Sequence, residues 1–182
     1  GDYEAGEVAR LAGIAVHLVL EEFRLDAEPA TEFALQVARL PEIIDGQASG
    51  AQRDATLLRA REILGHFGEG PLFERFTAIV PSVVAREIDV LTPGQEDGEG
   101  QPVAYTAGTV DLLYRDPETR AWVVVDYKTD RVRDPEALAS RAAGYQRQGE
   151  IYTRAVQEAL GLDETPRFEL WFLDSGQIVQ EP

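Results

Sequence analysis

The stretch Ala121-Trp122-Val123-Val124-Val125-Asp126-Tyr127-Lys128 decides the fold of this 182-residue chain. Its nearly continuous apolar run is typical of a strand buried on both faces, so we expect it at the centre of a sheet. Two charged side chains, Asp126 and Lys128, lie at the end of the run. Because side chains alternate along a strand, both belong to the same face of the sheet.

The segments before this strand predict helices followed by a hairpin. Apolar residues recur at helical spacing over 4–24, and residues 31–40 and 51–67 predict two further helices. The N-terminal third is therefore expected to be helical. Residues 78–91 and 103–114 alternate as strands do, and they predict a hairpin around a polar insert at 92–100.

The segments after the central strand complete an α/β pattern. Asp134-Pro135 has the residue types of a helix start, and that helix is expected to run to Leu160 and to end at Gly161. Residues 167–173 and 177–180 then predict a closing pair of strands. The sequence thus predicts a single domain with a central mixed sheet flanked by helices.

The register of the central strand with the strand before it decides which acids meet. If Asp116 pairs with Ala121 across the turn 117–120, Asp111 lies directly opposite Asp126. Asp111, Asp126 and Lys128 then converge on one face. A turn of odd length would instead send Asp111 to the other face.

Two carboxylates facing each other repel unless a positive charge lies between them, and a hard divalent cation suits them. Mg²⁺ bound there could accept phosphate oxygens, while the Lys128 ammonium acts on the attacking water and on the developing charge. The predicted chemistry is phosphodiester hydrolysis, with Asp111, Asp126 and Lys128 as catalytic residues. The alternative is a solvated strand end whose ion pairs contribute little.

Composition sets further limits. Lys128 is the only lysine among 17 basic residues, which suggests a role that arginine cannot fill. The chain has no cysteine, hence no disulfide or iron–sulfur cluster, and no apolar run long enough to predict a membrane span. A cytoplasmic location is expected. The missing methionine suggests a domain excised from a longer protein, and the net charge of −16 argues against a generic nucleic-acid-binding surface.

Five motifs together resemble the PD-(D/E)XK nuclease superfamily, and within it the RecB-type branch found at the C-terminus of UvrD/RecB-like and AddA/AddB-like repair helicases. The resemblance spans nearly the whole chain, and Asp-Tyr-Lys-Thr is its most specific motif. The motifs are, in order, Gly13-x-x-x-His17, Arg86-Glu87, Gly108-x-x-Asp111, Asp126-Tyr127-Lys128-Thr129 and Tyr145-x-x-Gln148-x-x-x-Tyr152.

This resemblance implies a restriction-endonuclease-like core and a metal site. It implies His17, Asp111, Asp126 and the backbone carbonyl of Tyr127 as ligands of Mg²⁺, with Mn²⁺ tolerated because an imidazole joins the oxygen ligands. Gly13 suggests the close approach of another backbone. His66, outside any motif, is interpreted as structural.

Other residues keep two interpretations. Glu87 is either an acid supporting the active site or an ion-pair partner, and His17 alone could be an ordinary core histidine. Gln148 and Tyr152 either contact the active site or DNA, or are ordinary core and surface residues of a helix. Tyr145 keeps the same two interpretations.

The resemblance implies a DNA exonuclease that cuts single strands delivered by a linked helicase during recombination and double-strand-break repair, with residues 1–182 as one domain from the C-terminus of a helicase–nuclease. A non-catalytic DNA-guiding or scaffolding module is the first alternative. A stand-alone nuclease acting on RNA or on structured DNA is the second.

Overall fold

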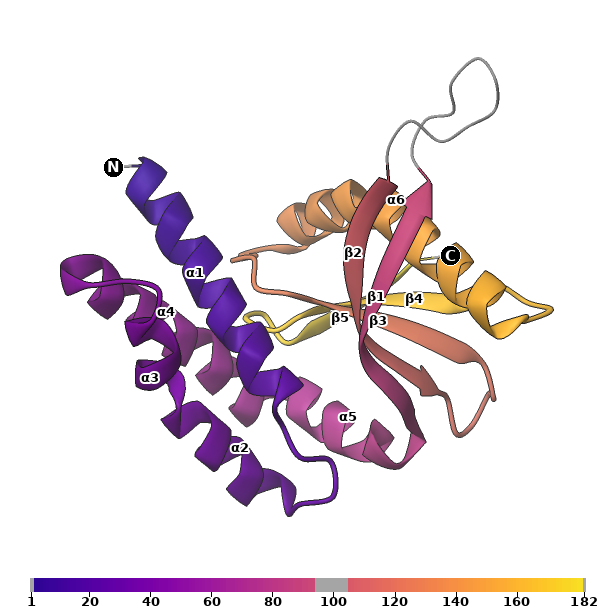
Figure 1. Cartoon of the computed structure of the whole chain (residues 1–182), viewed down its shortest axis with the longest axis horizontal. Coiled ribbons are helices and arrows are strands. Elements are labelled where there is room, and N and C mark those ends of the chain that lie inside the picture. The colour runs from indigo at the N-terminus through magenta and orange to yellow at the C-terminus, as the bar shows by residue number, and fades with distance from the viewer. Residues whose placement is uncertain (1, 94–104, 182) are drawn as a thin grey trace. The chain divides into compact units, whose positions relative to one another are not determined.

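The computed structural model describes residues 2–93 and 105–181 (Figure 1). Their helices and strands follow the order α1 (Asp2–Glu21), α2 (Pro29–Ala38), α3 (Leu40–Asp45), α4 (Gly50–Glu69), α5 (Pro71–Ile79), β1 (Val83–Pro93), β2 (Tyr105–Arg115), β3 (Trp122–Lys128), α6 (Pro135–Leu160), β4 (Arg167–Phe172) and β5 (Gln177–Glu181). A short 3₁₀ turn, Val80–Ser82, connects α5 to β1. The helical N-terminal third and the later strands confirm the predicted α/β class.

The five strands form one sheet in the order β1-β2-β3-β4-β5, so β3 is central as predicted. β1 pairs with β2, and β2 with β3, in antiparallel fashion. The long helix α6 connects β3 to β4 in the chain. The sheet is the mixed sheet of a restriction-endonuclease-like fold.

The described residues gather in two compact units. Unit 1 comprises Gly1–Val80, Tyr127–Arg133 and Trp171–Ile178, and unit 2 comprises Pro81–Asp126, Asp134–Leu170 and Val179–Pro182. The boundary between them falls within the sequences of β3, β4 and β5.

In unit 1, α1 buries one face chiefly against α4. Its residues Ala12, Ala15, Val16 and Val19 have no exposed surface, in agreement with the helical spacing that predicted this helix. Phe23, just beyond α1, meets Phe76 of α5 edge to face, with ring centroids 5.1 Å apart. Aromatic pairs in this geometry add to the stability supplied by burial.

In unit 2, α6 contacts β1 of the long β1–β2 hairpin. Its start and end match the sequence prediction. The Asp134 side chain accepts a hydrogen bond from Ala137 N–H at 2.8 Å, and Gly161 ends the helix with a left-handed φ of 59°. The predicted hairpin is confirmed, although Val103 and residues 94–100 of its insert lie outside the described residues.

The prediction that a strand begins at residue 78 was wrong. Residues 71–79 form α5, which the sequence analysis did not predict, and β1 begins only at Val83. Pro71 at the first turn favours a helix, and Leu72, Phe76 and Ile79 are buried at helical spacing. Burial of that face outweighs the β-branched residues that suggested a strand. The six-residue helix α3 was also not predicted, and α1 ends at Glu21 rather than at residue 24.

Candidate active site

The two acids of the predicted site come from neighbouring strands of unit 2. The β2–β3 register pairs Leu112 with Val125, so the next position along both strands sets Asp111 opposite Asp126. The turn that fixes this register is the predicted one, because Asp116 N–H donates to the Ala121 carbonyl at 2.9 Å. Asp111 is 4% exposed and Asp126 is 5% exposed. The juxtaposition predicted from turn parity is therefore confirmed.

Glu87 extends this row of acids by one strand. The β1–β2 register pairs Arg86 with Leu112 and Ile88 with Val110, which aligns Glu87 with Asp111. The backbone of Glu87 has a φ of 50°, a left-handed conformation that costs a residue other than glycine about 1–3 kcal/mol. Strain of this kind clusters at functional sites. The interpretation of Glu87 as an acid supporting the site stays a prediction.

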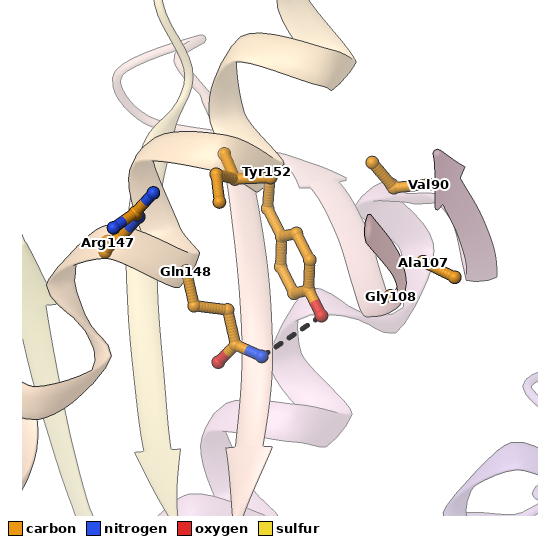
Figure 2. A pocket seen from close by; sticks show the side chains of 7 residues that line it. Val90, Ala107, Gly108, Arg147, Gln148 and Tyr152 are labelled. Carbon is orange, nitrogen blue, oxygen red and sulfur yellow. Dashed lines mark hydrogen bonds between the residues drawn. The ribbon is translucent and has the colours of Figure 1, made fainter. Parts of the chain in front are cut away.

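Tyr152 of α6 lies close to the acid pair. Burial raises the pKa of its hydroxyl, and the charges of Asp126 and Asp111 raise that pKa further. The hydroxyl accepts a hydrogen bond from Gln148 Nε2 at 3.1 Å, as Figure 2 shows. Gln148 and Tyr152 thus share one helix face, as their spacing predicts. Tyr145 lies half-buried on the same helix.

Gly108 leaves the space that Tyr152 occupies. A β-carbon at residue 108 would lie 2.8 Å from Cε1 of the Tyr152 ring, closer than real β-carbons come to other atoms, and 3.0 Å from Cζ. Gly108, the first residue of the Gly-x-x-Asp motif, therefore leaves room for the Tyr152 ring, and Asp111, the last, supplies a carboxylate. This coupling between two motifs was not predicted, because nothing in the sequence pairs residues so far apart.

In unit 1, α1 lies against the segment that follows the central apolar run. The His17 ring is 5.8 Å from the Tyr127 ring, centroid to centroid, at a tilt of 51°. A β-carbon on Gly13 would come 3.0 Å from Thr129 Oγ1. The prediction of a close approach at Gly13 is confirmed, but the approaching atom belongs to a side chain and not to a backbone.

The end of β3 is held by hydrogen bonds from two other elements of unit 1. The Lys128 carbonyl accepts a bond from Leu173 N–H at 3.0 Å. The Arg59 guanidinium of α4 donates to the Thr129 carbonyl at 3.2 Å and to the Asp174 carboxylate at 2.8 Å. Arg59 fixes the backbone next to Lys128, a function that no motif around residue 59 could have indicated.

Asp174 anchors Arg59 in turn. Burial raises the pKa of the Asp174 carboxyl, but hydrogen bonds from Arg59 and His66 outweigh burial and hold it below its ordinary value. His66 Nδ1 lies 2.7 Å from Asp174 Oδ1, in agreement with the structural role expected for His66.

The predicted site residues are divided between the units. His17, Tyr127 and Lys128 belong to unit 1, whereas Asp111, Asp126, Glu87, Gln148 and Tyr152 belong to unit 2. Within residues 2–93 and 105–181, no group of three or more His, Asp or Glu side chains has the arrangement of a metal site. The complete ligand set therefore stays a prediction.

The donor chemistry in unit 2 nevertheless suits a hard cation. Two buried carboxylates lie opposite each other on adjacent strands. Mg²⁺ binds proteins through one or two carboxylates and keeps several waters. Asp111 and Asp126 match that requirement.

The fold and the acid pair are those expected of a nuclease, and comparison with known sequences shows the class. The family model of the PD-(D/E)XK nuclease superfamily matches residues 3–182, and the chain belongs to this superfamily. This confirms the family indicated by the motifs.

Two curated relatives make the likeness more specific, and both are ATP-dependent helicase/nuclease subunits of the AddA type. The chain is 33% identical over 179 residues to the protein from Desulforudis audaxviator (strain MP104C), covering 92% of this chain but 14% of that protein. It is 32% identical over 90 residues to the protein from Lysinibacillus sphaericus (strain C3-41), covering 47% of this chain and 7% of that protein. The chain thus spans only a small part of the relatives it matches. Among the described helices, none is long and apolar enough to cross a membrane.

Proposed function

We propose that this chain is a Mg²⁺-dependent deoxyribonuclease domain of a larger helicase–nuclease. The buried Asp111–Asp126 pair carries the proposal, because two facing carboxylates repel each other and a divalent cation bound between them offsets that repulsion. Lys128 lies two residues beyond Asp126 on the same strand, and so on the same face. Membership of the superfamily supports the same chemistry.

In this proposal the carboxylates of Asp111 and Asp126, the His17 imidazole and the Tyr127 backbone carbonyl hold the cation. Bound Mg²⁺ supplies Lewis-acid stabilisation of charge on the phosphate, and Mn²⁺ substitutes for it. The contact of the His17 ring with Tyr127 in unit 1 supports the assignment of His17 to this group.

Lys128 contributes a compact charge that can orient the attacking water and stabilise the negative charge developing on the phosphate. Arginine would not substitute, since its guanidinium stays protonated and presents a planar fork. Glu87 is an acid that supports the carboxylates of Asp111 and Asp126. Gln148 keeps the Tyr152 hydroxyl in place through their hydrogen bond, and both contact DNA or support the carboxylates.

We further propose that the substrate is DNA, delivered as single strands by the helicase part of the parent protein and cut exonucleolytically in recombination and double-strand-break repair. The names of the relatives support a helicase-linked nuclease. With a net charge of −16, the surface of the chain as a whole contributes little affinity for DNA phosphates. This charge favours DNA that the helicase part delivers over DNA that the chain must capture by itself. We propose residues 1–182 as one nuclease domain from the C-terminal part of that protein. A cytoplasmic location stays a prediction.

Cleavage of end-labelled single- and double-stranded DNA tests the proposal. We expect cleavage with Mg²⁺ or Mn²⁺ and none with chelator. Lys128→Ala should lower the rate by about 10²–10⁴-fold, as is usual when a general acid or base is lost. Asp126→Asn should abolish cleavage, whereas Glu158→Gln, which changes an exposed acid on α6, should leave cleavage normal.

Circular dichroism should show that each variant remains folded. Wild-type rates for Lys128→Ala with Mg²⁺ would contradict the mechanism. A folded wild-type chain that binds DNA but cleaves nothing with either metal would favour the DNA-guiding role. Cleavage of RNA in preference to DNA would contradict the proposed substrate.

A further inference from the structure

A hollow of about 250 Å³ lies between α6 and the β1–β2 hairpin of unit 2, as Figure 2 shows. Val90 and Ala107 line it from the hairpin, together with the bare backbone of Gly108. Arg147, Gln148, Ile151 and Tyr152 line it from α6. All these residues belong to one unit, so the hollow is a feature of unit 2 itself.

The lining combines an apolar part with a cationic one. Val90, Ala107 and Ile151 supply aliphatic surface, and Arg147 supplies a guanidinium that is exposed to solvent. A nucleotide has the matching division, with an apolar base face and sugar at one end and a phosphate at the other. Arginine both binds phosphate and stacks on planar groups.

The size of the hollow limits its occupant. Pockets for drug-sized ligands measure about 300–1,000 Å³, so a hollow slightly smaller than these suits a single nucleotide rather than an oligonucleotide. Tyr152 is only 7% exposed, and its hydroxyl is hydrogen-bonded to Gln148. It therefore acts as a fixed wall rather than as a free stacking surface.

The hollow lies a short distance along β2 from the acid pair. Gly108 and Ala107 precede Asp111 by three and four residues on that strand, about 10–14 Å at the usual rise of a β-strand. Tyr152 forms a wall of the hollow and also lies near both carboxylates, whose charges affect its hydroxyl. An occupant would thus be a neighbour of the scissile bond in the same strand of DNA.

We propose that this hollow is a nucleotide subsite, which holds the base and sugar of a nucleotide flanking the scissile phosphodiester while Arg147 binds its phosphate. The inference rests on the proposed nuclease function, since it assumes a strand of DNA crossing the acid pair. It adds a determinant of substrate binding that lies outside the predicted catalytic residues.

Filling the hollow tests the proposal. Ala107 is exposed, so Ala107→Phe should fold and should occupy the space meant for the base. Ala143→Phe is the matched control, because Ala143 is exposed on α6 and does not line the hollow. The probes are fluorescent single-stranded oligonucleotides, either complete or with one base removed at successive positions.

We expect wild type to bind the complete oligonucleotide about five- to tenfold more tightly than the one lacking the base that fits the hollow, as measured by anisotropy with Ca²⁺ in place of Mg²⁺. Ala107→Phe should weaken binding of the complete oligonucleotide by a similar factor and erase the difference between the two probes. Under Mg²⁺, the same variant should raise KM more than it lowers kcat. Arg147→Gln should weaken all probes alike and reduce the salt dependence by about one phosphate contact.

These measurements distinguish failure of the proposed subsite from failure of the proposed nuclease function. If wild type cleaves DNA but Ala107→Phe binds and cleaves like Ala143→Phe, the subsite is refuted and the nuclease function stands. If wild type never cleaves but discriminates between the probes until residue 107 is filled, the hollow binds a nucleotide but the nuclease function, and with it a position beside a scissile bond, is refuted. Equal affinity of wild type for every probe refutes the subsite in either case.

Discussion

Gly108→Ala should destabilise the protein through a single contact. The added β-carbon would lie 2.8 Å from Cε1 and 3.0 Å from Cζ of Tyr152, and that ring is only 7% exposed. Overfilling a well-packed site usually costs about 1–3 kcal/mol. For a chain of this size we expect the melting temperature to fall by roughly 2–12 °C. Urea unfolding followed by tryptophan fluorescence measures the free-energy change.

The Tyr152→Ala variant tests whether the contact between residue 108 and the Tyr152 ring causes this loss of stability. In Tyr152→Ala the obstructing ring is gone, so Gly108→Ala should become neutral or stabilise by about 0.4–1 kcal/mol, because alanine restricts the unfolded chain. Gly144→Ala is the matched control: a β-carbon there meets nothing within 4 Å, and in mid-helix it should stabilise by up to about 1 kcal/mol. A penalty for Gly108→Ala that is equal in both backgrounds would refute the assigned contact.

Three further predictions concern stability. Arg59→Ala should cost about 1.5–3 kcal/mol in urea unfolding, since it removes a charge-assisted hydrogen bond to Asp174 and a bond to the Thr129 carbonyl. Exposed Arg61→Ala should change stability by less than about 0.5 kcal/mol. Hydrogen bonds from Thr119 N–H and Glu118 N–H, with the Arg167 guanidinium, lower the pKa of Asp116 to about 2 despite burial. Because folding lowers this pKa, the stabilisation that the Asp116 carboxylate gives the folded state is complete above the unfolded value near 4 and is lost as pH falls toward 2. Wild type should therefore be more stable than Asp116→Asn by about 2 kcal/mol at pH 7, and acid titrations of unfolding should show this difference vanish between pH 4 and pH 2. Asp134→Ala should cost about 1 kcal/mol by removing the cap of α6, and an unchanged midpoint would show that the cap contributes nothing.

Local patterns predicted the parts of the fold that local forces determine. The register of β2 with β3 follows from the short turn after Asp116, whose carboxylate accepts hydrogen bonds from the turn's own backbone. The bounds of α6 follow from the cap at Asp134 and from the left-handed Gly161. The acid pair was predictable for this reason, because it depends on one turn and on strand alternation.

Other features depend on contacts between distant segments and could not be predicted. Helix α5 was not predicted, and its last two residues were assigned to a strand, because its apolar face finds its partner only where Phe23 packs against Phe76. The contact of Arg59 with Thr129 joins residues from a helix and from a strand end. The hollow beside Tyr152 requires α6 to contact the hairpin, and no spacing within either segment reports that contact.

The hydrogen bond from Leu173 N–H to the Lys128 carbonyl has a consequence for the order of folding. The acids Asp111 and Asp126 belong to strands joined by a short turn, and such local pairings close quickly. The strand end at Lys128 must instead wait until α6 has formed and β4 has returned to the sheet, a closure over a much longer loop. We therefore expect a growing or partly folded chain to bring Asp111 and Asp126 together before it fixes the backbone at Lys128.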